Sequence, residues 1–304
     1  YIKRTIDVPV KAAAAITFGV LAERRNIDLH DPKLEWTSTI LYGFQQGLME
    51  HGHALKAIPF YDAYSGEIEG ARENLLKLAP SLSGLLVFPF LGMEKCISTL
   101  NETDIPWITV NQIGHAGTSN FVSADYYGAG LQVGKLFGEL GFKRVLYMRT
   151  DSGSYSESLR EHGLRDGLLA CGGAAEIQVV NCEQHLVKDG MNAMDGFLRK
   201  SGSAPQGVFA SGDLLAMGAI RACQEHNLQV PEQVAVVGST GIEAGCHFNP
   251  SLTTVSLPML RMGIEAAHML DALTQEKSMT TPGIILPVEF LERGSTPRRP
   301  SSLD

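Results

Sequence analysis

The chain has 304 residues, of which 44% are hydrophobic and 19% are charged, and these figures predict a soluble globular protein of about two domains. No apolar run approaches the roughly 18 residues that cross a membrane, and the first residues lack the pattern of a signal peptide. The formal net charge of -8 and the short, scattered Lys and Arg doublets argue against direct binding of nucleic-acid phosphates.

The five cysteines stand singly along the chain, at Cys96, Cys171, Cys182, Cys223 and Cys246. An odd number of cysteines without CxxC spacing predicts free thiols rather than a disulfide framework. Isolated cysteines among apolar neighbours are usually small buried core residues. This usage favours a reducing, cytoplasmic location.

Short apolar runs alternate with longer amphipathic stretches in the first part of the chain. The apolar runs predict strands at Ile16–Leu21, Leu55–Phe60, Gly84–Phe88 and Trp107–Val110. The amphipathic stretches predict helices at Trp36–His51, Glu67–Ala79 and Glu94–Leu100.

The same alternation then begins again. Strands are predicted at Val145–Met148, Ile177–Val180, Val208–Ala210 and Val234–Val237, and helices at Asp125–Leu140, Ser156–Ala170, Asp189–Arg199 and Asp213–His226. We expect Asp125 and Asp213 to cap their helices, because a carboxylate accepts hydrogen bonds from the free N–H groups of a first turn. Near-continuous apolar strands joined by helices predict two α/β lobes, each with a parallel sheet covered on both faces.

The last elements exceed what the second lobe needs. They are a strand at Thr253–Ser256, a helix at Leu260–Leu273 and a final strand at Ile284–Phe290. We therefore expect the chain to return to the first lobe and cross again. The predicted N-terminal lobe is 16–121 plus 258–283 and the C-terminal lobe is 122–257 plus 284–294. A linker at 1–15 and a disordered tail at 295–304 are expected outside them.

The motifs of common α/β enzymes are missing from the sequence. There is no GxGxxG after the first strand, and no GxxxxGK[ST], GxSxG or HExxH. His51 and His53 are the one close histidine pair, and they flank Gly52 in a predicted turn, which favours a surface turn over a metal site. We expect no catalysis, no cofactor and no metal.

One segment, Gly207–Thr254, carries a specific combination of motifs. Its matching pieces are Asp213, Ala216–Ala219, Val230–Glu232, Val234–Gly238 and Pro250–Thr254. Together with Asp125–Gly128, Gly141–Arg144, Arg160–Gly163 and Arg293–Ser295, they follow the order and spacing of a known family. From about Ile16 to Ser295 the chain resembles the effector-binding domain of LacI/GalR-type transcription regulators.

The resemblance implies a fold of the type-I periplasmic-binding-protein kind. In that fold two doubly wound parallel-sheet lobes are joined by three crossovers, and a small ligand binds between the lobes at the carboxyl ends of the strands. The crossovers would lie near Phe121–Val122, Ser256–Pro258 and Gly283–Ile284.

The family's ligand contacts carry over to Trp36, Asn111, Arg160 and His185 of this sequence. Asp213 and Thr240 also fall at ligand-binding positions, although the sequence departs from the family pattern at both. Gly212-Asp213 replaces an Asn-Asp pair, and Thr240 replaces an aspartate that usually binds ligand. The resemblance therefore implies either a sugar bound in a different way or an effector that is not a sugar.

Each of these residues also has a simpler interpretation. Trp36 could pack in the core or at its rim, Arg160 could form a surface ion pair, and His185 could be solvated. Asp213 could be purely structural and Asn111 a turn residue. The family spacing favours the ligand-binding interpretation most clearly for Arg160.

The implied function is that of the effector-binding and dimerisation region of a transcription regulator. It would bind a small, sugar-like effector and form a homodimer through Met217 and Phe248. Operator DNA would be bound through a separate domain, and Tyr1–Arg4 resembles the end of a GntR-type winged-helix domain. A sugar-binding protein of a transporter, which shares the fold, is the alternative. The cysteine usage, the N-terminal residues and the Leu252–Thr254 segment disfavour that alternative.

Overall fold

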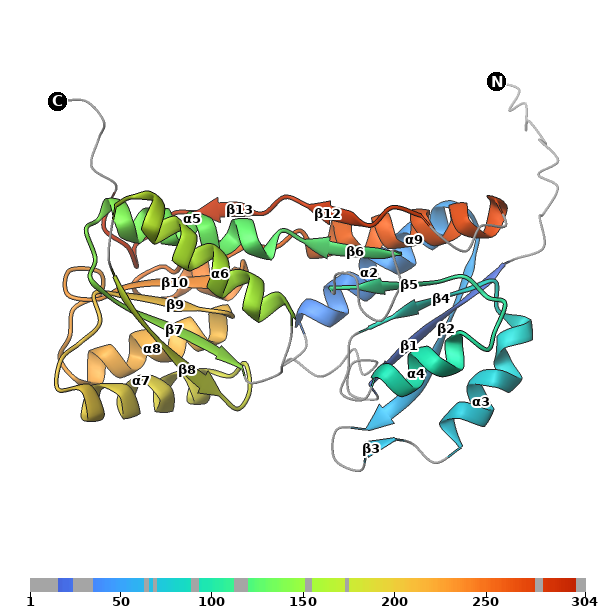
Figure 1. The fold of residues 1–304 in the computed structure, drawn as a ribbon, viewed down its shortest axis with the longest axis horizontal. Coiled ribbons are helices and arrows are strands. Elements are labelled where there is room, and N and C mark those ends of the chain that lie inside the picture. The colour runs from blue at the N-terminus through green and yellow to red at the C-terminus, as the bar shows by residue number, and fades with distance from the viewer. Residues whose placement is uncertain are drawn as a thin grey trace, which may run out of the picture.

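The computed structural model describes residues 16–23, 35–62, 66–67, 70–88, 93–111, 120–150, 155–172, 175–276 and 281–298. The linker expected at residues 1–15 and the last residues of the expected tail, 299–304, lie outside this part of the chain. Two α/β lobes lie end to end, and the chain passes between them after β6, after β11 and after β12 (Figure 1).

The N-terminal lobe contains a seven-stranded sheet with the order β12-β6-β5-β4-β1-β2-β3. Its strands are β1 (Thr17–Glu23), β2 (Ala54–Asp62), β3 (Gly66–Glu67), β4 (Gly84–Val87), β5 (Trp107–Val110), β6 (Phe121–Ala124) and β12 (Ile284–Leu286). All neighbours pair in parallel except β2 and β3. Its helices are α2 (Glu35–Glu50), α3 (Ala71–Leu78), α4 (Met93–Leu100) and α9 (Met259–Glu276), with a short 3-10 turn at Ala79–Ser81.

The C-terminal lobe contains a six-stranded sheet with the order β13-β11-β10-β9-β7-β8. Its strands are β7 (Arg144–Thr150), β8 (Glu176–Cys182), β9 (Gly207–Ala210), β10 (Ala235–Thr240), β11 (Thr253–Ser256) and β13 (Glu289–Leu291). β13 runs antiparallel to β11, and the other pairs are parallel. Its helices are α5 (Tyr126–Glu139), α6 (Tyr155–Ala170), α7 (Val187–Ser201) and α8 (Asp213–Glu225), with a 3-10 turn at Glu243–His247.

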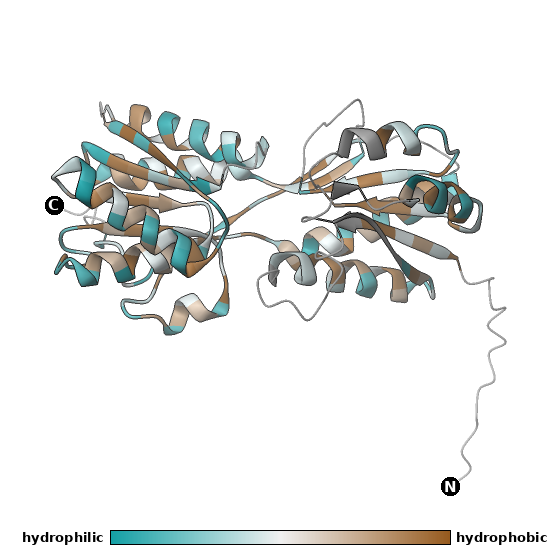
Figure 2. Ribbon diagram, turned by 90° about the horizontal axis from the view of Figure 1, so that it is seen from below, coloured by the Kyte–Doolittle hydropathy of each residue, from teal (hydrophilic) through white to brown (hydrophobic). Residues whose placement is uncertain are grey.

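Each sheet is buried on both faces, as the continuous apolar strands predict. In β4, Leu85 and Val87 face the core under α3 and α4, whereas Leu86 faces the core under α2 and α9. In β7, Val145 and Tyr147 face α5 and α6, while the alternate residues face α7 and α8. Figure 2 shows apolar strands between helices in each lobe and narrow segments joining the lobes. Apolar burial on both faces of both sheets is the main source of stability.

Paired glycines bring the covering helices into close contact. A Cβ added at Gly163 in α6 would overlap the carbonyl oxygen of Tyr127 in α5, and one at Gly130 would overlap that of Arg160. The same arrangement joins α2 to α9 through Gly43 and Gly263, and α7 to α8 through Gly190 and Gly218. These helix pairs are therefore fixed at a separation that only glycine permits.

Three details differ from the sequence predictions. The predicted strand at 284–290 is two strands, β12 and β13, which belong to different sheets and are separated by Pro287, a residue without an N–H to donate to a ladder. Because β6 and β12 pair with each other in the N-terminal sheet, the chain leaves that lobe after residues 124 and 286, slightly later than predicted. The helix predicted at Glu67–Ala79 is α3, which begins at Ala71, after Gly70 with φ 71°.

The start of the expected disordered tail is also wrong. Ser295 and Thr296 are buried, with 0% and 3% of their surface exposed. The Ser295 hydroxyl donates to the Val236 carbonyl at 2.6 Å and accepts from the Thr253 amide at 2.8 Å. These bonds fasten the end of the described chain to the C-terminal sheet.

Among the described residues, no helix is both long enough and apolar enough to span a membrane. The cysteines whose surroundings are described, Cys171, Cys182, Cys223 and Cys246, are all free thiols.

Candidate functional site

The carboxyl ends of the parallel strands in both lobes point toward the middle of the molecule (Figure 1). Ligands of open α/β sheets bind beyond these ends. Among the described residues, those that follow the strands, together with the first turns of the helices behind them, therefore form the candidate site. We call this region the inter-lobe face.

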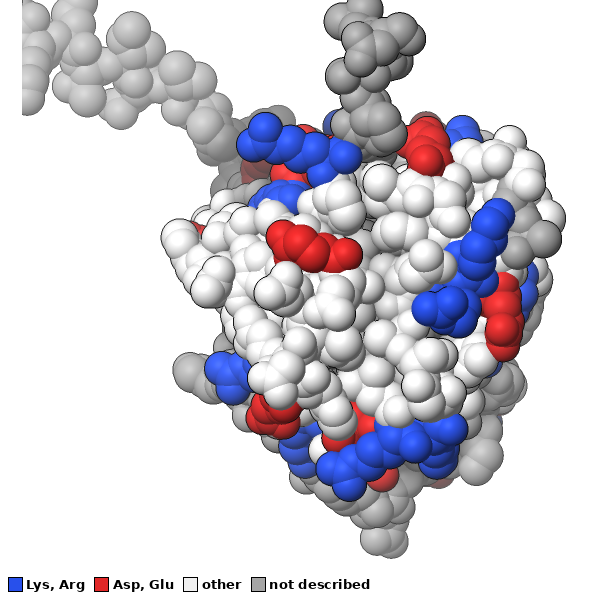
Figure 3. All heavy atoms as spheres, turned by 90° about the vertical axis from the view of Figure 1, so that its left-hand side faces the viewer, with Lys and Arg blue, Asp and Glu red and all other residues white. Residues whose placement is uncertain are grey.

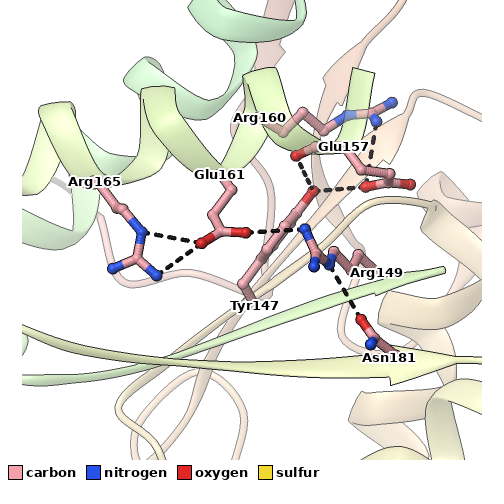
Figure 4. Close-up of polar contacts among 7 residues, drawn as sticks. All are labelled: Tyr147, Arg149, Glu157, Arg160, Glu161, Arg165 and Asn181. Atoms are coloured by element: carbon pink, nitrogen blue, oxygen red, sulfur yellow. Dashed lines mark hydrogen bonds and ion pairs between the residues drawn. The ribbon is translucent and has the colours of Figure 1, made fainter. Parts of the chain in front are cut away.

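A buried polar cluster in the C-terminal lobe joins Tyr126 of α5 to residues of β7 and α6. Figure 4 shows its members Tyr147, Glu157 and Arg160. Arg160, with 5% of its surface exposed, places its guanidinium carbon 4.3 Å from the centroid of the Tyr126 ring. Its Nη1 lies 3.6 Å from Oε2 of Glu157, which also accepts a hydrogen bond from the Tyr147 hydroxyl at 2.7 Å. The cluster contains one cation and one anion, which offset each other.

The two tyrosines of this cluster keep their protons. Burial raises the pKa of Tyr126 to about 12, although the nearby Arg160 opposes this. Burial, reinforced by Glu157, raises the pKa of Tyr147 well above its usual value. Tyr147 therefore acts as a hydrogen-bond donor to Glu157 and orients that carboxylate.

A more exposed set of ion pairs lies beside the buried cluster on α6 (Figure 4). Glu161 binds Arg165 at 2.7 Å and Arg149 at 3.0 Å, and Arg149 also donates to the Asn181 side chain at 3.1 Å. The contacts of Arg149 connect α6 to β7 and β8 and help to fix the helix that carries Arg160, whereas the pair between Glu161 and Arg165 lies within α6.

His185, which follows β8, contributes to the same region. Its Nε2 lies 3.1 Å from the Thr150 hydroxyl and 3.9 Å from Oε1 of Glu157. Loss of solvation lowers the pKa of His185, and Arg160 lowers it further, while Glu157 and Asp189 oppose the shift. The ring is therefore neutral at pH 7 and can both donate and accept a hydrogen bond.

Several buried polar atoms at or near the inter-lobe face have no hydrogen-bond partner among the described residues. They are Thr37 Oγ1, Arg160 Nε, Asp189 Oδ2, Ser211 Oγ and Ser239 Oγ. Buried polar atoms are normally paired, because an unpaired one costs about 1–3 kcal/mol. These five atoms belong to the first turns of α2 and α7, to α6, and to the ends of β9 and β10. Unpaired polar atoms on these elements are available to bind a polar ligand.

The Asp213 carboxylate forms hydrogen bonds within the C-terminal lobe. The prediction that it caps α8 is wrong. The capping position is Gly212, with no side-chain bond to the helix. Oδ2 of Asp213 instead accepts from the amides of Gly241 and Ile242, each at 2.8 Å, and Oδ1 accepts from the Thr254 hydroxyl. The carboxylate therefore fastens the loop after β10 to β11.

Thr240, at the end of β10, accepts a hydrogen bond from the Asp213 amide at 3.4 Å. The predicted cap at Asp125 is confirmed, because its side chain accepts from the Gly128 amide at 2.7 Å. Asp125 is thus structural, and Thr240 keeps a half-buried place at the inter-lobe face.

Trp36 and Asn111 are the predicted contacts on the N-terminal lobe. Trp36 lies in the first turn of α2, half-buried, with its ring 6.3 Å from that of Phe88. Asn111 follows β5 with φ 62°, and its backbone N–H donates to the Val122 carbonyl at 2.9 Å. Trp36 therefore lies at the start of a helix and Asn111 at the carboxyl end of a parallel strand of the N-terminal sheet.

Met217 and Phe248, predicted at a subunit contact, have neighbours within their own lobe. Met217 is 9% exposed and belongs to the core under α7 and α8. Phe248 is half-buried against the same core, with the Arg221 guanidinium 5.9 Å from its ring. Phe248 is therefore the more accessible of the two.

A hollow of about 630 Å³ lies elsewhere on the C-terminal lobe. Its lining includes Arg144 and Glu176, which begin β7 and β8, and Pro205, which precedes β9. The hollow therefore lies at the amino ends of the strands, away from the inter-lobe face. Ligands of open α/β sheets bind at the carboxyl ends, so the hollow is not the expected ligand site.

The sequence did not single out Tyr126, Tyr147, Glu157, Asp189, Ser211 or Ser239. Glu157 precedes Arg160 by three residues on the same helix face. That spacing is typical of an ion pair on a helix and would have allowed the sequence to predict this contact. Tyr147 and Ser211 could not be found in this way. A polar residue inside or just after a continuously apolar strand does not change the periodicity of the sequence, so the pattern does not reveal its role.

A family model described as "Periplasmic binding protein-like domain" matches residues 135–296. The HTH-type transcriptional regulator RegA of Clostridium saccharobutylicum is 27% identical over 232 residues, 76% of this chain and 70% of RegA. The regulator CelR of Thermobifida fusca is 30% identical over 52% of this chain and 46% of CelR. The chain thus spans about half of one relative and somewhat over two thirds of the other.

Solved structures show the same fold. The complex of the regulator CelR with cellobiose has a TM-score of 0.78 at 23% identity, over 92% of this chain and 84% of that one. The lac repressor dimer bound to operator and an anti-inducer also has a TM-score of 0.78, at 20% identity, over 94% and 95% of the two chains. The matched family model covers more than half of the chain, and the chain therefore belongs to the periplasmic binding protein-like domain family.

Proposed function

We propose that this chain is the sensing and dimerisation region of a transcription regulator and that it binds a neutral sugar between its lobes. The group of buried, unpartnered polar atoms at the inter-lobe face carries the proposal. The names of the relatives, which are transcription regulators, and the cellobiose complex of CelR support it.

The charges around Arg160 favour a neutral effector over a sugar acid. Glu157 already offsets the guanidinium at 3.6 Å, and Asp189 adds a second buried carboxylate nearby. An anionic ligand would meet uncompensated negative charge there. Hydroxyl groups of a sugar could instead donate to Asp189 Oδ2 and accept from Arg160 Nε, and the face of the ring could pack on Trp36.

The proposed response is a change in the angle between the lobes. The three passages after β6, β11 and β12 are the connections about which the lobes would move. A ligand that contacts both lobes binds more tightly to one arrangement than to the other, and that difference makes it an effector.

Operator binding is assigned to a part of the protein outside residues 16–298. Figure 3 shows the outer end of the C-terminal lobe with Lys and Arg side chains in separate groups among Asp and Glu. Such a surface lacks the single basic stripe that phosphate binding needs. In this role the protein works in the cytoplasm as a two-fold dimer, and the dimer contact includes Phe248 and, more weakly, Met217.

A thermal-shift screen tests this proposal. Neutral mono- and disaccharides, sugar acids and nucleosides are added separately, and stabilisation follows RT ln(1 + [L]/Kd). We expect a neutral sugar, at one concentration, to raise the melting temperature of the wild type more than that of Arg160→Gln. Stabilisation by sugar acids alone, or equal stabilisation of the variant, would overturn the proposed ligand class or site.

A further inference from the structure

A second cluster of ligand-type side chains lies at the opposite end of α2 from Trp36, about 21 Å along the helix. Glu50 ends α2, His51 follows it, and His268 lies on α9, which packs closely on α2 through Gly43 and Gly263. One possible ligand atom from each of the three residues lies within 4.8 Å of the other two. The His268 Nε2 and Glu50 Oε2 atoms are 3.2 Å apart.

A buried carboxylate stands behind this cluster. Asp271, three residues after His268, has a side chain that is 7% exposed and accepts hydrogen bonds from His53 Nε2 at 2.9 Å and Gln275 Nε2 at 2.6 Å. Its Oδ2 also faces Nδ1 of His51 at 4.0 Å. At 4.0 Å this is a charge contact and not a hydrogen bond, and it favours the His51 tautomer whose proton is on Nδ1, which leaves Nε2 available to a metal.

The surrounding rings restrict the orientation of His51. Its ring stacks on that of His53 with centroids 5.8 Å apart and meets the His268 ring edge-on at 5.9 Å. His53 in turn contacts the buried ring of Phe18 at 5.3 Å. The cluster is therefore built on two packed helices and a buried support, while its outer side chains stay 40–59% exposed.

Two imidazoles and one carboxylate match the ligand preference of zinc and similar divalent transition metals. Ligand atoms bound to one tetrahedral zinc are about 3.3 Å apart, which is the separation that His268 and Glu50 already have. The carbonyl groups at the end of α2 add partial negative charge that favours a cation.

We propose that Glu50, His51 and His268 bind one divalent transition-metal ion of the zinc type, with water completing its coordination and Asp271 orienting His51. The prediction of a plain surface turn at His51 and His53 could not include His268, which only the packing of α9 on α2 brings to the turn. This site is independent of the proposed sugar site, because it uses none of the residues of the inter-lobe face.

The test is calorimetric titration of the tag-free, metal-stripped protein with zinc chloride. We expect one zinc ion per chain, and weakening of that binding by at least about tenfold in His51→Gln and in His268→Gln. His162→Gln serves as the matched control, because His162 is an exposed histidine on α6 outside the cluster. Cobalt, whose visible absorption changes on binding nitrogen ligands, reports the coordination directly.

Circular dichroism without metal establishes that each variant is folded, and the exposed Glu50→Gln provides a further variant should a histidine substitution fail to fold. A wild type that binds zinc no more tightly than the His51→Gln, His268→Gln double variant would overturn the proposal. So would loss of binding in the His162→Gln control to the same extent as in His268→Gln.

Discussion

The guanidinium of Arg160 lies over the ring of Tyr126, with its central carbon 4.3 Å from the ring centroid. The two residues come from α6 and α5, which contact each other through backbone at Gly163 and Gly130. A cation over an aromatic face in a buried site is stabilised by the ring and held in place. The position of Arg160 therefore depends on the packing of two helices and not on α6 alone.

Arg160→Gln should weaken effector binding by about tenfold to a hundredfold, the cost of losing a charge-assisted bond of about 1.5–3 kcal/mol. Calorimetry with the sugar found in the screen measures the change. Arg165→Gln, on the same helix but 43% exposed, should leave the affinity unchanged. Equal affinity in wild type and Arg160→Gln would remove Arg160 from the site.

Gly163→Val should destabilise the C-terminal lobe, because the new side chain would overlap the Tyr127 carbonyl and force α5 and α6 apart. Overpacking of this kind costs about 1–3 kcal/mol. The control is Gly196→Ala in α7, where an added Cβ meets nothing within 4 Å. The higher helix propensity of alanine should raise the free energy of unfolding of this control by about 0.5–1 kcal/mol. Urea unfolding compares the two variants. An unchanged free energy of unfolding in Gly163→Val would contradict the close contact between α5 and α6.

Asp213→Asn should lower the free energy of unfolding by about 1–3 kcal/mol, because an amide nitrogen cannot accept the bonds that the second carboxylate oxygen receives. The amides of Gly241 and Ile242, or the Thr254 hydroxyl, would then lose their acceptor. Asp166→Asn, which affects an exposed bond from Tyr127, is the matched control. Denaturant unfolding in which both variants behave alike would argue against the structural role.

His185 should make stability fall on the acid side of neutrality. Its pKa is lowered in the folded protein, so below about pH 6.5 the unfolded chain binds more protons than the folded one. The wild type should therefore lose stability relative to His185→Gln as the pH falls from about 7.5 to about 5.5. Thr150→Val, which removes the partner but keeps the ring, should retain the dependence. Parallel profiles for wild type and His185→Gln would contradict this.

Phe248→Asp should dissociate the proposed dimer and leave the monomer folded, as measured by sedimentation. Met217 is unsuited to this test because its side chain is part of the core, so a charge there would unfold the lobe. Leu169→Asp, at an α6 side chain that is 66% exposed, is the control and should remain dimeric. A dimer that persists in Phe248→Asp would place the contact elsewhere.

The sequence predicts the two-lobe α/β fold well, because buried parallel strands such as β4 and β9 are continuous apolar runs. It predicts less well the last strands, where Pro287 separates two short pieces that pair in different sheets. Ser295 was assigned to a polar tail because composition does not reveal the two hydrogen bonds that fasten it.

The candidate site was predictable where the family pattern carries a residue, as at Arg160. The partners of Arg160 were not predictable, since Tyr126 and Tyr147 belong to the faces of α5 and β7 that also form the core. The role of Asp213 was misassigned because a helix-start aspartate is usually a cap, whereas here the loop after β10 supplies its partners.

Hydrogen exchange measured with and without the identified sugar tests the central claim most directly, because it reports both lobes in one experiment. We predict simultaneous protection in the N-terminal lobe around Trp36 and in the C-terminal lobe around residues 185–190, 211–214 and 239–242. Protection confined to one lobe, or located at the hollow beside Arg144 and Glu176, would contradict binding between the lobes.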